Sequence, residues 1–153
     1  MDNLSQLMED ISGMIKTLIG KKPLKISELK KNLASEFKNK YKKGTKKAPG
    51  VYLIRKEGEI IYIGETDNLI RRLIGDIGKA RISINPKTGK EKLFHSLNRH
   101  IKEENSLLTS EGIKIEHKNY SFSYIETESK NMAKAIEGIL IKQLSESGHL
   151  INK

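Results

Sequence analysis

The 153-residue chain contains no cysteine, few aromatic residues and no long apolar segment. The absence of cysteine excludes disulfides, zinc fingers and thiolate metal sites, and it fits a reducing cytoplasm. Aromatic residues make up only 5% of the chain, so we expect a mostly aliphatic core. No apolar stretch approaches the roughly 20 residues that cross a bilayer, and acidic residues near the start are unlike a signal peptide. A cytoplasmic protein without a membrane partner is therefore expected.

Positive charge is abundant and unevenly distributed. The chain has 29 Lys and Arg residues against 19 Asp and Glu residues, which gives a net charge of +10. Residues 1–48 carry 12 basic and 5 acidic residues, whereas residues 49–153 carry 17 and 14. This excess favours a polyanionic partner, although a solvated basic surface would have the same composition. The N-terminal third ends in a lysine tract that either contacts phosphates or forms a solvated linker. Its lysines include Lys42, Lys43, Lys46 and Lys47.

The spacing of apolar residues predicts the order of the secondary structure. Two helices are expected in the N-terminal third, the first over residues 4–18. The segments "GVYLIRK" and "EIIYIGE", rich in Val, Ile and Tyr, predict a β-hairpin. A helix capped by Thr66 or Asp67 should follow, and the final helix should run from about residue 129 to residue 143. Between these two helices we expect a polar loop over 81–92, a helix over 93–104 and extended chain over 113–126.

One carboxylate stands inside the apolar stripe of the final predicted helix. Ala133, Leu140, Ile141 and Leu144 share the helix face of Glu137. A carboxylate among apolar side chains is costly to desolvate unless it is paired or binds a cation. The alternative is a glutamate at the edge of the stripe that reaches solvent or an arginine, and the helix by itself favours this alternative.

Tyrosines and an arginine on the hairpin and the next helix supply a reason to bury that carboxylate. Tyr52 and Tyr62 lie on the paired strands, and Arg72 lies about two turns into the following helix. An arginine can hold a scissile phosphate, and a carboxylate can hold Mg²⁺. A tyrosine can orient water, or deprotonate it if cationic neighbours lower the tyrosine pKa. The alternatives are ordinary strand propensity for the tyrosines and a surface ion pair between Arg72 and Asp76.

Several segments of the sequence resemble the GIY-YIG nuclease family. "GVY" and "YIG", which contain Tyr52 and Tyr62, are similar to the two halves of the family motif. "TDNLIRR" is similar to the segment that carries the family arginine, and the spacing from the second tyrosine selects Arg72 rather than Arg71. "MAKAIEGILIKQL" resembles the helix that carries the metal-binding glutamate, here Glu137, and "HLINK" is similar to the closing asparagine segment.

The resemblance implies an α+β fold, in which a small antiparallel sheet of about three strands is flanked by helices. It covers roughly residues 48–153, which would form the nuclease domain, with an insert at about residues 81–118. Residues 1–47 would be a basic helical extension that joins this domain in one compact unit. The insert and the extension would both grip the substrate.

The same resemblance implies a metal-dependent endonuclease that hydrolyses phosphodiester bonds in nucleic acid, usually DNA, with one Mg²⁺ or Mn²⁺ ion. We expect a restriction-like or structure-specific enzyme from a bacterium or a phage, since no separate DNA-binding module is recognisable. The alternative is a nucleic-acid-binding module on the same scaffold, with weak or no catalysis. The apolar stripe of the first helix leaves open a third possibility, contact with another protein or a dimer.

The resemblance also implies a role for each site residue. Tyr52 would be the general base or would orient the water, and Tyr62 would support it and line the phosphate pocket. Arg72 would stabilise the phosphoryl transition state. Glu137 would hold the metal ion, and Asn152 would brace the site. Exposed basic side chains, namely Arg71 and the lysines of the tract, would contact the nucleic-acid backbone.

One departure from the family pattern concerns the general base. Many members carry a His or Tyr one turn after the arginine, where this chain has Asp76. His95 and His100 could substitute, although a histidine beside an apolar face is more often structural. The usual proline before the closing asparagine is also absent. The accessory residues of the site are therefore expected among Gly64, Asp76, His95 and His100.

Overall fold

The computed structural model of the protein describes residues 3–25, 48–73, 82–93, 120–147 and 150. Helix α1 (Asn3–Gly20) comes first and helix α4 (Lys130–Leu144) comes near the end of the chain. Both confirm the helices predicted from the apolar spacing. Neither they nor any other helix of the described residues is long and apolar enough to cross a membrane. The second predicted N-terminal helix, and nearly all of the helix predicted over 93–104, lie outside the described residues.

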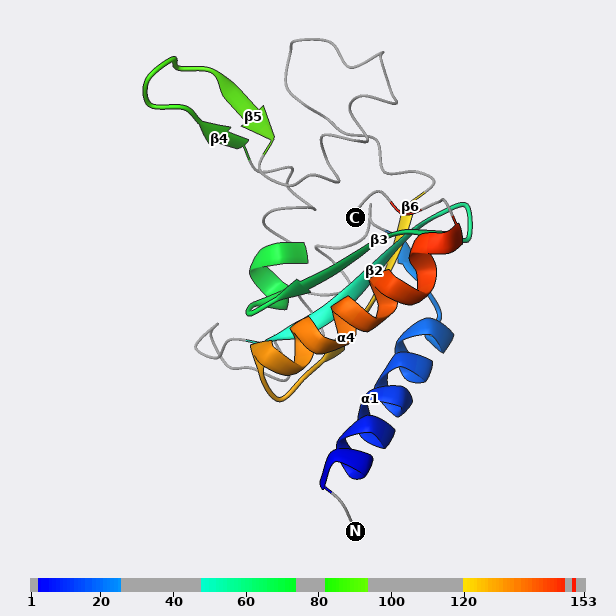
Figure 1. Cartoon of the computed structure of the whole chain (residues 1–153). Helices are drawn as coiled ribbons and strands as arrows, with labels where there is room; N and C mark the ends of the chain where they lie inside the picture. The colour runs from blue at the N-terminus through cyan, green and yellow to red at the C-terminus, as the bar shows by residue number, and fades with distance from the viewer. Residues whose placement is uncertain (1–2, 26–47, 74–81, 94–119, 148–149, 151–153) are drawn as a thin grey trace.

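One open antiparallel sheet contains four strands in the order β1-β6-β2-β3 (Figure 1). The predicted hairpin is formed by β2 (Gly50–Lys56) and β3 (Glu59–Thr66), whose turn residues Glu57 and Gly58 have positive φ. Strand β6 (Tyr120–Glu126), predicted as extended chain, pairs with the other side of β2. The two-residue strand β1 (Leu24–Lys25) pairs with β6. The expected α+β fold is therefore present, with four strands in this sheet rather than about three.

The expectation of a polar loop over residues 81–92 is wrong, because two short strands form there. Strand β4 (Ile82–Ile84) pairs antiparallel with β5 (Glu91–Leu93) in a separate two-stranded sheet. Asn85 organises their connection: its carbonyl oxygen accepts the Gly89 N–H at 2.8 Å, and its side-chain oxygen accepts the Lys87 N–H at 2.9 Å. Gly89 has a φ of 69°, which glycine adopts without strain. The turn-forming residues of this segment thus close a hairpin.

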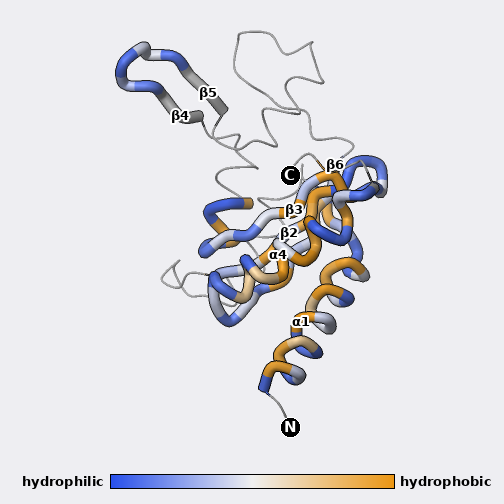
Figure 2. Tube along the Cα trace, in the orientation of Figure 1, coloured by the Kyte–Doolittle hydropathy of each residue, from blue (hydrophilic) through white to orange (hydrophobic). Residues whose placement is uncertain are grey.

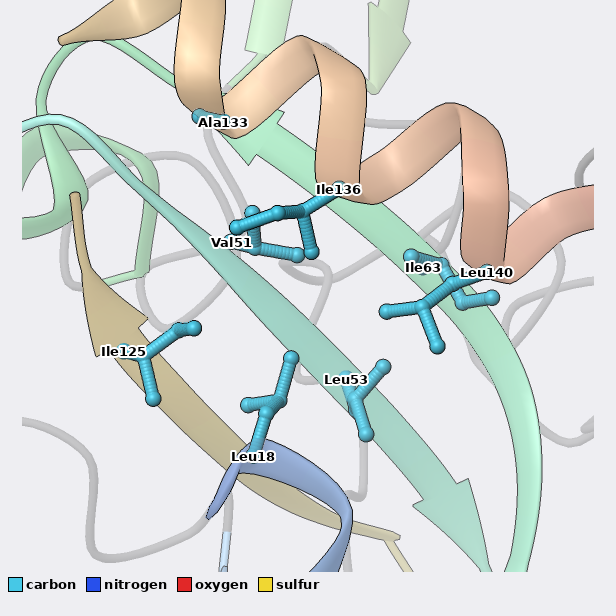
Figure 3. Close-up of a cluster of buried hydrophobic side chains, with 8 residues drawn as sticks. All are labelled: Leu18, Val51, Leu53, Ile63, Ile125, Ala133, Ile136 and Leu140. Carbon is cyan, nitrogen blue, oxygen red and sulfur yellow. The ribbon is translucent and has the colours of Figure 1, made fainter. Parts of the chain in front are cut away.

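The four-stranded sheet has one aliphatic face and one aromatic face. Helices α1 and α4 pack on the aliphatic face, and Figure 2 shows hydrophobic residues gathered along the strands beneath them. The buried cluster between helices and sheet (Figure 3) consists of Leu18, Val51, Leu53, Ile63, Ile125, Ala133, Ile136 and Leu140. Because side chains alternate along a strand, the opposite face carries Tyr52, Tyr62, Tyr120, Phe122 and Tyr124. Only the helix-covered face matches the mostly aliphatic core expected from composition.

The side chain of Ser129 caps the N-terminus of α4. Ser129 has an extended backbone, and its side chain accepts a hydrogen bond from the Met132 N–H at 3.1 Å. This bond satisfies one of the backbone donors that the first turn of a helix leaves without a partner. Ala133, Ile136 and Leu140 then follow at helical spacing and are fully buried. The cap and the apolar stripe together fix the rotation of α4, and hence the direction in which Glu137 projects.

Two basic side chains attach the C-terminal end of α1 to the sheet. Arg55 on β2 is only 7% exposed and donates to the carbonyl oxygen of Ile19 and to Oγ of Ser123, both at 3.0 Å. Lys21 donates to the carbonyl oxygen of Tyr124 at 2.7 Å, and its Nζ lies 4.6 Å from the centroid of that ring. Cations at a helix C-terminus interact favourably with its free carbonyl groups. The first helix is therefore held by polar contacts as well as by Leu18.

Candidate active site

Tyr52 packs across the neighbouring strand and over Gly64. The two residues are opposite each other in the β2–β3 ladder. A methyl group on Gly64 would collide with the Cζ, Oη and Cε1 atoms of Tyr52. Gly64 is thus required because the tyrosine ring approaches its backbone closely. Tyr52 is only 1% exposed, and its hydroxyl reaches β3, which is an edge strand of this sheet.

Tyr62 stands beside Tyr52 on the aromatic face. It precedes Gly64 by two residues on β3 and pairs with Ile54. The two tyrosine rings are stacked, with 6.1 Å between their centroids and 21° between their planes. A hydrogen bond also joins their side chains. The structure therefore brings together the two tyrosines of the motif, one buried and one half-buried.

Arg72 is positioned by a turn and a short helical segment that follow β3. The Thr66 hydroxyl accepts the N–H of Asn68 at 3.0 Å, and the side-chain oxygen of Asn68 accepts the N–H of Arg71 at 3.1 Å. Asn68 is thus the helix cap, in place of the expected Thr66 or Asp67. Residues 69–73 are helical, and Leu69 and Leu73 are completely buried. These two anchors leave Arg72 half-buried at the aromatic face of the sheet.

The neighbouring arginine points elsewhere. Arg71 is exposed, and its guanidinium pairs with the carboxylate of Asp67 at 3.2 Å. The choice of Arg72 over Arg71 as the site arginine is therefore consistent with the positions of both side chains. Arg71 remains a prediction as a backbone contact for nucleic acid. The alternative for Arg72, an ion pair with Asp76, is untested because Asp76 lies outside the described residues.

The charges around Tyr52 converge from three parts of the chain. Burial raises the pKa of the Tyr52 hydroxyl well above its usual value, and the nearby Tyr62 raises it further. The positive charge of Arg72 lowers this pKa, and the negative charge of Glu137 raises it. Burial outweighs the arginine, so the shift is opposite to the one that a general base needs. The hydroxyl stays protonated and acts as a hydrogen-bonding group.

Glu137 lies half-buried on α4, next to the end of β3. Burial raises the pKa of its carboxyl group, and the negative charge of Glu65 raises it further. A hydrogen bond from the Glu65 backbone and the positive charge of Lys134 lower it. The half-buried Glu137 keeps some contact with solvent, as expected for a glutamate at the edge of the stripe. Its carboxylate also faces a second carboxylate across the sheet edge.

Glu65 was not foreseen from the sequence as a site residue. It directly follows Gly64 and is opposite Val51 in the ladder, so it lies on the sheet face that α4 covers. One oxygen of its carboxylate, Oε2, is buried and has no hydrogen-bond partner. A buried charged oxygen without a partner is unfavourable unless a cation is close. Strand alternation puts residues 63 and 65 on one face of β3, but no local pattern in the sequence tells that α4 covers that face.

The donor atoms near Glu137 suit a hard divalent cation. Mg²⁺ and Mn²⁺ prefer carboxylate and water oxygens, and Mg²⁺ sites in proteins often use only one or two carboxylates. Groups of three or more His, Cys, Asp or Glu side chains with metal-binding geometry are absent from the described residues. A site with two carboxylates is compatible with that finding. The buried oxygen without a partner on Glu65 is compatible with such an ion.

A separate cavity of about 770 Å³ lies between α1, β6 and the start of α4. Leu7, Met14 and Ile125 contribute apolar lining. Its carboxylates are Glu9, Asp10, Glu126 and Glu128. Four acidic side chains would repel a phosphate backbone, so this cavity is a poor candidate for a nucleic-acid site.

The remaining predicted site residues lie outside the described residues. They are Lys42, Lys43, Lys46, Lys47, Asp76, His95, His100 and Asn152. The identity of a general base among Asp76 and the two histidines therefore stays a prediction. The bracing of the site by Asn152 and the phosphate contacts of the lysine tract also stay predictions.

Comparisons with protein-family models, with curated proteins and with solved structures found no match to this chain. The GIY-YIG assignment therefore depends on the similarity of the motifs. The function has to be argued from the geometry of the site itself.

Proposed function

We propose that the protein is a metal-dependent endonuclease that hydrolyses phosphodiester bonds in DNA, either restriction-like or structure-specific. The observation that carries this proposal is the convergence of four functional groups on the edge strand β3. Tyr52 contacts Tyr62, and the charges of Arg72 and Glu137 both act on its hydroxyl. A purely structural tyrosine on an aromatic face needs neither an arginine nor a glutamate beside its hydroxyl.

The half-buried Arg72 is the group that would hold the scissile phosphate. A guanidinium matches two phosphate oxygens with parallel hydrogen bonds, and partial burial strengthens that attraction. The buried Leu69 and Leu73 on either side of it limit the movement of its backbone. Arg72 would therefore present a fixed positive charge to the negative charge that grows on the phosphate in the transition state.

Tyr52 would orient the attacking water without removing its proton. The raised pKa keeps the hydroxyl neutral, and the hydrogen bond with Tyr62 favours this protonated form. A neutral hydroxyl still has oxygen lone pairs that can accept a hydrogen bond from water. Of the two roles that the family resemblance implies for Tyr52, the electrostatics support the water-orienting one.

Glu137, with its oxygen donors at the sheet edge, would hold one Mg²⁺ or Mn²⁺ ion. When bound, such an ion stabilises the charge on the leaving oxygen. The carboxylate is fixed by the packing of α4 and by the hydrogen bond from the Glu65 backbone. This placement brings the cation site and Tyr52 to the same strand.

Exposed lysines of α4 would guide the DNA backbone to the site. Lys130 and Lys134 are exposed and precede Glu137 by seven and three residues, so they share its side of the helix. Neutralising phosphates with lysines makes binding fall steeply with salt concentration. These contacts position the backbone and do not read sequence.

The decisive experiment compares cleavage of linear, flapped and branched DNA in Mg²⁺, in Mn²⁺ and in chelator. Arg72→Ala and Glu137→Ala should each lower kcat by about 100-fold or more, as removal of transition-state stabilising groups does in other enzymes. Lys142→Ala and Glu146→Ala, which alter exposed groups of the same charge, should cleave like wild type. Equal loss in all four variants would argue against the assigned site.

A second function is favoured by one observation, the raised pKa of Tyr52. Without a base, the scaffold would bind nucleic acid and cleave it poorly or not at all. This reading predicts steep salt dependence of binding with no metal-dependent product on any DNA or RNA. The same substrates and buffers therefore discriminate the two functions.

A further inference from the structure

Two carboxylates meet at the edge of the sheet, one from a strand and one from a helix. Glu65 lies on the edge strand β3, and Glu137 projects from α4 beside it. The backbone of Glu65 donates a hydrogen bond to Glu137, so the two residues are in direct contact. Their negative charges repel each other in a half-buried place where water screens them poorly.

One carboxylate oxygen of Glu65 lacks a hydrogen-bond partner. This oxygen, Oε2, is buried and accepts no hydrogen bond. Two other buried polar side chains are satisfied: Arg55 donates to two oxygens, and Thr66 bonds to the backbone of Asn68. A half-buried carboxylate with one such oxygen, placed next to another carboxylate, is stabilised by a cation.

We propose that Glu65 is a second carboxylate ligand of the divalent cation that Glu137 would hold, so that the metal site bridges strand β3 and helix α4. The inference rests on the proposed function for the choice of a divalent metal, and on the buried oxygen of Glu65 for the ligand. Two carboxylates balance the charge of one Mg²⁺ or Mn²⁺ ion. Water and substrate oxygens complete the coordination that these ions prefer.

The register of the sheet explains why this ligand sits at the site. Gly64 and Glu65 are adjacent, so strand alternation sends them to opposite faces. Gly64 supports the Tyr52 ring on the aromatic face, and Glu65 faces α4 on the other. One dipeptide thus positions both the tyrosine hydroxyl and the metal ligand, and a shift of one residue in the register would separate them.

The competing explanation is a proton shared between the two carboxylates, as in other close carboxylate pairs. The two explanations differ in their response to Glu65→Gln, which keeps the shape of the side chain and removes its charge. A shared proton predicts a variant that binds Mg²⁺ as wild type does. A second metal ligand predicts a variant that binds it much more weakly.

The test is calorimetric titration of the apo protein with Mg²⁺ and with Mn²⁺, together with melting temperatures in chelator and in saturating metal. Glu65→Gln should weaken metal binding by about tenfold or more, since even outer-shell partners of a metal ligand are worth about 10–100-fold. It should also lose most of the metal-induced rise in melting temperature, while being at least as stable as wild type in chelator because the repulsion is gone. Glu137→Gln should behave in the same way.

Glu59→Gln is the matched control. Glu59 is an exposed carboxylate at the other end of the same strand, so its variant should bind metal like wild type. Unchanged metal affinity in Glu65→Gln would overturn the inference. If Glu65→Gln does not fold, Glu65→Asp, which keeps the charge and shortens the reach, should still bind metal more weakly, and wild-type affinity in that variant would equally overturn it.

These outcomes separate the inference from the proposed function. Metal-dependent DNA cleavage by wild type, with unchanged metal binding in Glu65→Gln, would leave the nuclease and remove Glu65 as a ligand. Weakened metal binding in Glu65→Gln, with no cleavage of any substrate by wild type, would leave the metal site and remove the nuclease. Both results are read from binding and melting data as well as from activity.

Discussion

Replacing Gly64 with alanine tests the packing that holds the Tyr52 hydroxyl in place. The change adds one methyl group to β3, at the position opposite Tyr52. That methyl would overlap three atoms at the hydroxyl end of the tyrosine ring. Because the ring is only 1% exposed and stacked on Tyr62, it has little room to move away.

The expected cost follows from that overlap. Overpacking of a filled site typically costs about 1–3 kcal/mol. Alanine recovers about 0.5–1 kcal/mol relative to glycine in a strand, because the unfolded chain has less backbone freedom. The steric term should dominate, and we expect Gly64→Ala to destabilise the protein by about 1–2 kcal/mol. For a chain of this length, that corresponds to a fall in melting temperature of roughly 2–8 °C.

Chemical denaturation followed by circular dichroism measures this change, and two further variants make it specific. Gly138→Ala adds the same methyl on the exposed side of α4, where nothing lies within 4 Å. It should stabilise the protein by about 0.5–1 kcal/mol, since alanine is the better helix former. In a Tyr52→Leu background, which removes the hydroxyl end of the ring, Gly64→Ala should cost almost nothing.

Two results would contradict the predicted clash between the new methyl group and the Tyr52 ring. If Gly64→Ala costs the same in the wild-type and Tyr52→Leu backgrounds, the methyl group does not act through the tyrosine ring. If it stabilises the protein as Gly138→Ala does, Tyr52 does not lie over Gly64. The close approach that defines the candidate site would then be absent.

Three other predictions concern charge, capping and pH. Arg55→Ala should destabilise the protein by more than about 2 kcal/mol, because the buried guanidinium donates two charge-assisted hydrogen bonds. Arg71→Ala, which breaks an exposed ion pair, should destabilise it by less than about 1 kcal/mol. Similar denaturation midpoints for the two variants would contradict the anchoring of α1 by Arg55. Ser129→Ala should cost about 1 kcal/mol through loss of the helix cap, and an unchanged midpoint would mean that the cap contributes nothing. The pKa of Tyr52 is raised in the folded state, so the folded chain keeps a proton that the unfolded chain releases, and stability should fall as pH rises above about 10. Tyr52→Phe should make that decline shallower, which denaturation at a series of alkaline pH values will show.

Local patterns were enough to predict the hairpin, the first and last helices and the tyrosine pair. Short segments rich in Val, Ile and Tyr identify β2 and β3, and apolar residues at helical spacing identify α1 and α4. The face of α4 that carries Glu137 also follows from spacing, since Ala133 and Leu140 lie on the same side of the helix. These features depend on residues close together in the chain.

Other features of the fold and the candidate site could not be predicted from such local patterns. Glu65 becomes a site residue only because α4 crosses β3 at that position, which no local pattern records. A lowered pKa was the condition for Tyr52 to act as a general base, but burial under packed side chains outweighs Arg72 and raises this pKa. The cap after β3 is Asn68 because the Thr66 hydroxyl is already bonded to the backbone of Asn68. The short hairpin at β4 and β5 has too few strand residues to be distinguished from a loop by composition.

The division of the sheet into two faces makes the two halves of the core spectroscopically distinct. The chain has no tryptophan, and four of its five tyrosines lie on the aromatic face. Tyrosine fluorescence and near-ultraviolet circular dichroism will therefore report mainly on that face, while far-ultraviolet circular dichroism follows α1 and α4 on the other. Transitions that coincide in both signals would show that the tyrosine pair and the helices unfold as one cooperative unit.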